Sequence, residues 1–131
     1  MNNLPILCAF LALAGATLAQ PNSNSNWTGV WQGELEGLPS VILTLATDDG
    51  SLQGTLVLNG INTDDGGPHI AVRETHSLLQ PKLNGSTLSF GVKGLRGSMS
   101  FIVEQTSNTT AKIHCLSCGS DAPTVEITKA D

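Results

Sequence analysis

Three short runs of sequence decide the fold: W-T-G-V-W-Q-G-E at 27–34, V-I-L-T-L at 41–45 and L-Q-G-T-L-V-L at 52–58. Side chains of a strand alternate between two faces, so the two Trp and two Gly of the first run are expected on one face. Asp49-Gly50, just before the third run, is typical of a hairpin turn. The stretch therefore predicts three consecutive antiparallel strands joined by short turns.

The rest of the chain repeats this pattern more weakly. Further strands are expected at 69–76, 88–92, 99–103, 111–115 and 125–127. The segment 61–68 is expected to be a loop, and 78–84 is expected to be irregular because Pro81 lacks the N–H that a central strand needs. The sequence thus predicts an all-β domain, an eight-stranded antiparallel up-and-down barrel, with a two-sheet β-sandwich as the alternative.

The first 19 residues resemble a secretory signal peptide. Leu4–Leu18 is almost continuously apolar, and Thr17-Leu18-Ala19 predicts cleavage before Gln20, with Ala14-Gly15-Ala16 as an alternative site. A membrane anchor is the rival interpretation, but the run is shorter than the roughly 20 residues that span a bilayer. We therefore expect a signal peptide at 1–19, a disordered polar leader at 20–26, and one domain at 27–131 that is secreted or periplasmic, with no membrane span in the mature chain.

Charge and composition exclude several classes of function. The chain has a net charge of −5 and only six scattered Lys and Arg residues, which argues against nucleic-acid binding. No nucleophile motif or phosphate-binding loop is present, and nothing in the sequence fixes a separation between carboxylates for glycoside hydrolysis. We expect a monomer with no catalytic residues, no metal and no cofactor; a hydrolase-like enzyme stays the third hypothesis.

Two short motifs carry a resemblance to known families. Gly29-Val30-Trp31 matches the G-x-W signature of lipocalins, and with Gly50–Thr55 (G-S-L-Q-G-T) it resembles the opening of avidin-type barrels. The resemblance implies an eight-stranded barrel that binds a small molecule in its mouth. Gly29, Trp31 and Gly54 are expected to be structural residues, and Gly54, on the inner face of its strand, is expected to leave room for a Trp ring from the first strand. The absence of Tyr and the lack of further Trp make biotin an unsuitable ligand.

A longer resemblance runs from the first strand to G-S-T-L-S-F at 85–90. It is to small secreted bacterial domains of unassigned function, which occur alone or beside hydrolase domains, and it implies no activity. The chain departs from the lipocalins in being shorter and in lacking their C-terminal helix.

Cys115 and Cys118 form a C-x-x-C motif. They are the two cysteines left once the signal peptide is removed, so in an oxidising compartment they are expected to form a disulfide. Free thiols and a redox-active pair are the alternatives. Redox-active pairs sit where the thiol pKa is lowered, typically at a helix N-terminus, whereas this motif follows an expected strand.

The leading hypothesis for function is a non-enzymatic module that binds a small apolar molecule. The predicted barrel lining comprises Leu43, Leu45, Leu56, Leu58, Phe90, Met99 and Phe101, which would equally suit a packed core. Glu74 and His76, two apart on one strand, would orient a ligand if their face is the interior; otherwise both lie in solvent. The alternative is a structural or protein-interaction domain of the cell envelope with a packed core and an outer apolar patch at Val30, Ile42, Val57 and Ile102.

Overall fold

The computed structural model describes residues 26–94 and 97–130, and the predicted signal peptide lies outside these residues. All nine elements in this part of the chain are strands, which confirms the all-β prediction: β1 (Gly29–Leu35), β2 (Leu38–Asp48), β3 (Ser51–Asp64), β4 (Gly67–Ser77), β5 (Leu79–Asn84), β6 (Thr87–Gly94), β7 (Gly97–Gln105), β8 (Thr110–Cys115) and β9 (Thr124–Lys129). Within the same residues, no helix has the length and apolar character needed to cross a bilayer.

The strands form one antiparallel sheet in the order β4-β3-β2-β1-β9-β8-β7-β6-β5. The first and last strands therefore lie side by side in the middle, where Trp31 pairs with Lys129. The edges are β4 and β5, which follow each other in sequence but form no ladder. The prediction of a closed eight-stranded barrel is wrong, because the described sheet has nine strands and stays open between β4 and β5.

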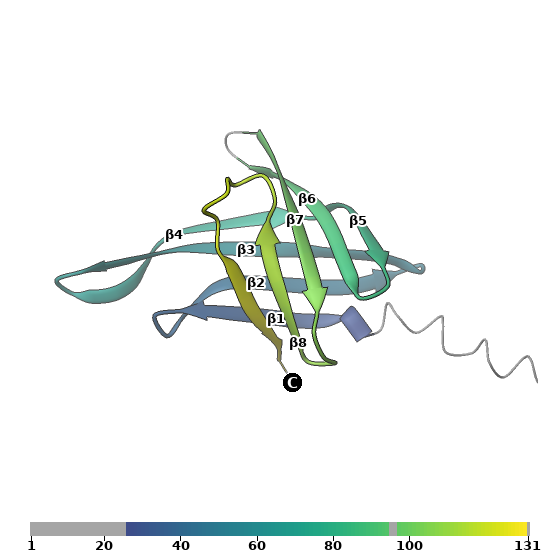
Figure 1. Ribbon diagram of the computed structural model, residues 1–131, viewed down its shortest axis with the longest axis horizontal. Coiled ribbons are helices and arrows are strands. Elements are labelled where there is room, and N and C mark those ends of the chain that lie inside the picture. The colour runs from purple at the N-terminus through teal and green to yellow at the C-terminus, as the bar shows by residue number, and fades with distance from the viewer. Residues whose placement is uncertain (1–25, 95–96, 131) are drawn as a thin grey trace, which may run out of the picture.

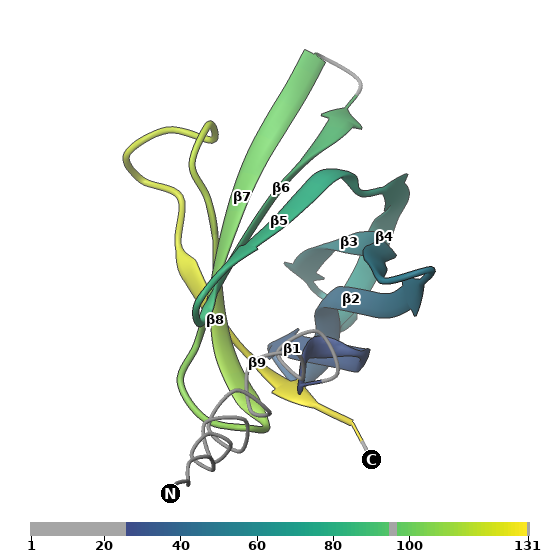
Figure 2. The same cartoon turned by 90° about the vertical axis from the view of Figure 1, so that its right-hand side faces the viewer.

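The sheet curls, so its two halves face each other. In Figure 1, β1–β4 run across the view and β6–β9 run steeply through it; Figure 2 shows the two halves as separate layers that diverge at one end. The backbone N–H of Leu78, between β4 and β5, donates a 3.0 Å hydrogen bond to the Gly54 carbonyl of β3. This bond ties the start of the second half to the first, although the edges do not pair.

The ninth strand is β5, in the segment that was expected to be irregular. Its ladder with β6 is interrupted between Leu79 and Lys82, and Pro81 lies in that interruption. Because β5 is an edge strand, one of its sides faces no neighbouring strand, and the missing N–H of Pro81 costs no hydrogen bond on that side. The prediction that 78–84 is irregular was therefore wrong, although the effect of Pro81 on pairing is visible.

The hairpin of β3 and β4 is longer than predicted. The segment 61–68 is not a loop: both strands continue to a tight turn between Asp64 and Gly67, in which the Gly66 N–H donates to Asp64 Oδ1 at 3.0 Å. A bulge at Ala71 shifts the register, so Val72 pairs with Gly60 while Ile70 pairs with Ile61. The hairpin projects from the body of the molecule at the left of Figure 1.

The core fills the space between the two halves. Its fully buried side chains come from strands of both halves and from the residues before β1: Trp27, Trp31, Leu43, Leu45, Leu56, Leu88, Val92, Val103 and Ile127. The residue pattern accounts for this, since the inner positions of β2 and β6 are Leu, Val or Phe at every second residue. Asn26 and Trp27 are helical, so the prediction that Trp27 belongs to the first strand is wrong.

Gly54 does not make room for a Trp ring. A Cβ atom built on it would collide with the Thr44 carbonyl and lie 3.1 Å from Leu45 Cδ2. The close neighbour is thus the backbone of β2, not the first strand, which corrects the prediction. The absence of a side chain at Gly54 lets β3 approach β2 closely, and its carbonyl accepts the bond from Leu78.

Candidate functional site

An apolar pocket of about 220 Å³ lies between the two halves of the sheet. Val41 of β2 and Leu58 of β3 form one wall. The opposite wall and rim come from β7, β8, β9 and the loop between β8 and β9: Met99, Phe101, Ile113, Cys115, Cys118, Ala122, Pro123 and Val125. Every one of these side chains is apolar or a disulfide cysteine, so the pocket suits an apolar guest.

Strand pairing places the pocket residues. Val41 lies directly opposite Leu58, and Ile113 lies opposite Val125, so each pair projects from one face of the sheet. Phe101 pairs with Phe90, and their rings stack with centroids 5.5 Å apart. Phe101, which borders the pocket, thus packs against Phe90 within the same half of the sheet.

The predicted lining divides between pocket and core. Leu58, Met99 and Phe101 border the pocket. Leu43, Leu45 and Leu56 are fully buried in the core, and Phe90 is buried against Phe101. The pocket therefore lies toward one end of the interior and does not run through it.

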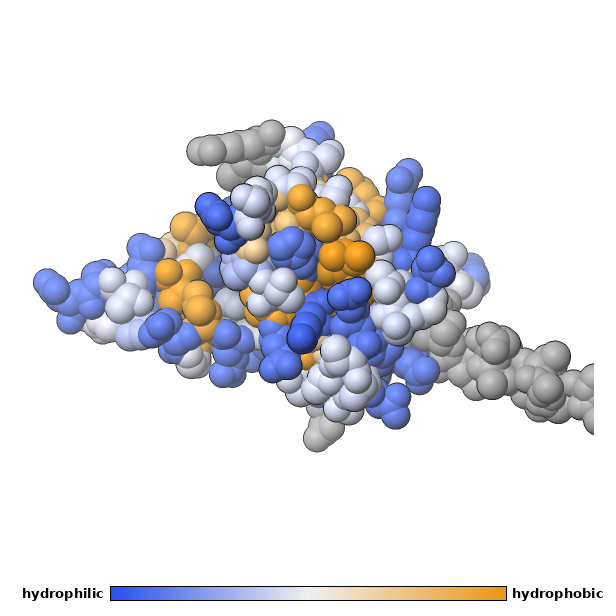
Figure 3. All heavy atoms as spheres, viewed as in Figure 1, coloured by the Kyte–Doolittle hydropathy of each residue, from blue (hydrophilic) through white to orange (hydrophobic). Residues whose placement is uncertain are grey.

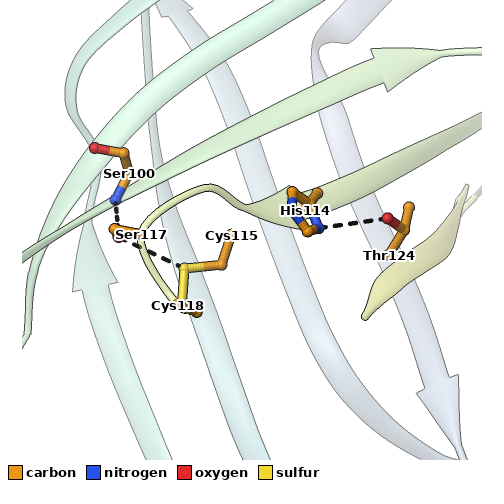
Figure 4. The surroundings of a disulfide bond; sticks show 6 residues. All are labelled: Ser100, His114, Cys115, Ser117, Cys118 and Thr124. Atoms are coloured by element: carbon orange, nitrogen blue, oxygen red, sulfur yellow. Dashed lines mark hydrogen bonds between the residues drawn. A yellow bond between two sulfur atoms is a disulfide. The ribbon is translucent and has the colours of Figure 1, made fainter. Parts of the chain in front are cut away.

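Cys115 and Cys118 form a disulfide with Cα atoms 5.4 Å apart, which confirms the predicted pairing. The bond closes the turn that follows β8, at the rim of the pocket (Figure 4). Ser117 fixes this turn to β7, because its Oγ accepts a 2.9 Å hydrogen bond from the Ser100 N–H. The turn is not the N-terminus of a helix, the usual setting of redox-active pairs, so its geometry favours a structural role.

Glu74 and His76 lie on the inner face of β4. They pair with Leu58 and Leu56, whose side chains point into the interior, and paired residues share a face. His76 Nε2 lies 3.0 Å from Glu74 Oε1, and the side chains are 10% and 37% exposed, respectively. Of the two interpretations of this pair, the structure supports the interior one, although the pair lies on an open edge strand.

Asn59 is a buried polar residue that the sequence analysis missed. Its Nδ2 donates to the Pro39 carbonyl at 2.9 Å, and its Oδ1 accepts from Arg73 Nε at 3.0 Å. These bonds join β2, β3 and β4 on the outer face. The signal that could have indicated it is a polar residue directly after the apolar run L-V-L at 56–58.

Trp31 and Gly29 lie at the end of the interior near both described ends of the chain. The Trp31 indole Nε1 donates to the Trp27 carbonyl at 2.9 Å, and Lys129 Nζ lies 5.7 Å from the Trp31 ring centroid. Gly29 has φ +138°, and a Cβ atom there would meet the Lys129 side chain at 2.8 Å. The two motif residues thus contact the last strand.

The predicted outer patch does not form one surface. Ile42 and Val57 are neighbours on β2 and β3, whereas Ile102 lies on β7 in the other half. Figure 3 shows apolar surface near β7 and on the β3–β4 hairpin, with polar side chains between them. A second hollow, of about 450 Å³, lies beside β5–β7. Serines, Gln80 and Lys82 border it together with Leu79, Phe90, Met99, Phe101 and Leu116, so its lining is more polar than that of the 220 Å³ pocket.

No protein-family model, curated protein or solved structure matches this chain. The resemblance to lipocalins and avidins therefore stays a prediction. Among residues 26–94 and 97–130, no group of three or more His, Cys, Asp or Glu side chains is placed to hold a metal ion. The candidate site therefore consists of the apolar pocket and the Glu74–His76 pair on the strand beside Leu58.

Proposed function

We propose that this protein is a secreted, monomeric, non-enzymatic module that binds a small apolar molecule between the halves of its sheet. The observation that carries the proposal is the pocket bordered by Val41, Leu58, Met99 and Phe101, in which core side chains of both halves remain partly uncovered. A dry apolar cavity of about 150 Å³ takes up benzene, so a pocket of about 220 Å³ suits a single ring or a short chain.

Three further arguments support this function. Uncovered apolar surface favours an apolar guest, because transferring that surface from water to the ligand is favourable. The Cys115–Cys118 disulfide at the rim is the kind of bond that persists in oxidising compartments, which suits a secreted protein. The G-x-W motif points the same way, since the barrels it resembles bind small molecules.

Toluene is a suitable first probe because it is apolar and fits the size of the pocket. We would titrate it into protein with ¹³C-labelled methyl groups and follow the methyl resonances by NMR. The expected result is a saturable shift of the pocket methyls of Val41, Leu58, Met99, Ile113 and Val125, with the core methyls of Leu45 unchanged. A folded protein with no saturable shift of the pocket methyls overturns the proposal.

Two substitutions on adjacent positions of β3 provide a matched pair. Leu58→Phe adds volume inside the pocket, whereas Val57→Phe adds it on the outer face. Leu58→Phe is expected to weaken toluene binding at least tenfold, and Val57→Phe is expected to leave it unchanged.

Native mass spectrometry of protein secreted by its own host would then identify a naturally bound small molecule by the mass lost on denaturation.

A further inference from the structure

A row of four paired residues leads from the centre of the sheet past the pocket to its edge. Gly33 of β1 lies opposite Val41, Val41 opposite Leu58, and Leu58 opposite Glu74. Residues paired in this way share a face and have Cβ atoms about 5 Å apart. The row that contains Val41 and Leu58 therefore ends at Glu74, which lies next to the pocket wall but does not itself line the pocket.

His76 holds the carboxyl group of Glu74 in place. It lies in the adjacent row, opposite Leu56, and its imidazole is almost completely buried. Its Nε2 engages Glu74 Oε1 at 3.0 Å, and the described part of the chain provides no other side-chain partner for Glu74. The second carboxyl oxygen is therefore available to a ligand, while the first fixes the direction of the group.

Apart from His76, the nearest basic side chain along β4 is Arg73, and it does not neutralise this carboxyl group. Arg73 lies on the opposite face, where its Nε donates to Asn59. Among residues 26–94 and 97–130, no charged side chain lines the pocket. A ligand that reaches from the pocket to β4 thus meets a single acidic group beside an apolar surface, which favours a cationic head and disfavours an anionic one.

Resting on the proposed function, we propose that the pocket selects small apolar amines. The apolar part lies between Leu58 and Met99, and the ammonium group donates a charge-assisted hydrogen bond to Glu74, which His76 positions. Glu74 is then the residue that determines specificity, and the ligand class is a single-ring or short-chain primary amine.

Toluene, benzylamine and benzoate test this inference because they share a ring and differ in charge. Affinities would be measured by methyl NMR titration on the full protein. Benzylamine is expected to bind about tenfold tighter than toluene, a change equivalent to one charge-assisted bond. Benzoate is expected to bind more weakly than toluene.

Three variants separate the role of the carboxyl group from general effects. Glu74→Gln is expected to remove the preference for benzylamine and leave toluene binding unchanged. His76→Gln is expected to reduce the preference only in part, since it loosens the carboxyl group without removing it. Glu104→Gln, on the solvent-exposed side of β7, removes the same charge far from the row and is expected to have no effect.

The outcomes distinguish this inference from the proposed function. Toluene binding without a preference for benzylamine overturns the inference and leaves the proposed function standing. A preference that survives Glu74→Gln also overturns it. Failure of toluene to bind the folded protein overturns the proposed function itself.

Discussion

The indole Nε1 of Trp31 donates a 2.9 Å hydrogen bond to the backbone carbonyl of Trp27, and the two rings lie 5.7 Å apart. The bond joins β1 to the helical residues before it, and both side chains are fully buried. A buried acceptor without a donor is costly, so this pair fixes how the chain enters the sheet.

Trp31→Phe is expected to lower the free energy of unfolding by about 1–3 kcal/mol beyond the loss of ring area, because the Trp27 carbonyl loses its donor. Trp27→Phe is the matched control, since it removes the same ring area but keeps the backbone acceptor. Urea unfolding followed by circular dichroism measures both variants. Equal destabilisation by the two variants would contradict a role for the hydrogen bond.

Gly54→Ala is expected to destabilise the protein by about 3 kcal/mol, the upper end for an overpacked site, because the new Cβ collides with the Thr44 carbonyl. Gly60→Ala on the same strand is the control: its Cβ would lie at an ordinary 3.6 Å from Val72 Cβ, so a change within about 1 kcal/mol is expected. Thermal and urea unfolding compare the two. Similar stabilities would show that β3 can move away from β2 at this point.

Asn59→Ala is expected to cost about 1–3 kcal/mol, because it leaves the half-buried Pro39 carbonyl without the Asn59 donor. Arg73→Met keeps the aliphatic stem, removes only the guanidinium and is expected to cost less, since Asn59 still satisfies Pro39. Chemical denaturation ranks the variants. A larger loss of stability for Arg73→Met than for Asn59→Ala would show that the hydrogen bond between Arg73 and Asn59 matters more than the one between Asn59 and Pro39.

Reduction of the Cys115–Cys118 disulfide is expected to lower stability by only about 2 kcal/mol, because the loop it closes is short. It should also weaken toluene binding, since both cysteines border the pocket. Thermal unfolding and methyl titration with and without a phosphine reductant measure the two effects. The Cys115→Ala/Cys118→Ala variant is the control, and any response of that variant to reductant would show that the effect does not come from the disulfide.

The strands were predictable wherever one face is fully buried. In β6, Leu88, Phe90 and Val92 alternate with small or exposed residues, and alternation of this kind is a direct consequence of a half-buried sheet. In β4 a strand was predicted at 69–76, but alternation did not show which side chains face the interior, because its residues are largely exposed and the alternation breaks at Ala71. Pro81 misled the prediction of β5 because a proline is unfavourable in a central strand and acceptable at an edge.

Closure of the sheet and the far side of the pocket were not predictable. Whether β4 meets β5 depends on twist and coiling summed over all strands, which no short motif encodes. Alternation alone indicated Leu58 and Met99, because inner positions follow from the period. Ala122 and Pro123 reach the pocket through a loop whose path depends on the disulfide turn and on β9, so the sequence offered no local sign of them.

The pairing of the first described strand, β1, with the last, β9, has a consequence for folding kinetics. Within the described sheet, every pairing except that of β1 with β9 joins strands that follow each other in sequence, so most of the sheet forms from local hairpins. Contacts between Trp31 and Lys129 close the longest loop and must overcome the largest entropic barrier. In a circular permutant that links β9 to β1 and opens the chain between β4 and β5, every strand pairing would join strands that follow each other in sequence. This permutant should fold faster than the protein with the natural strand order.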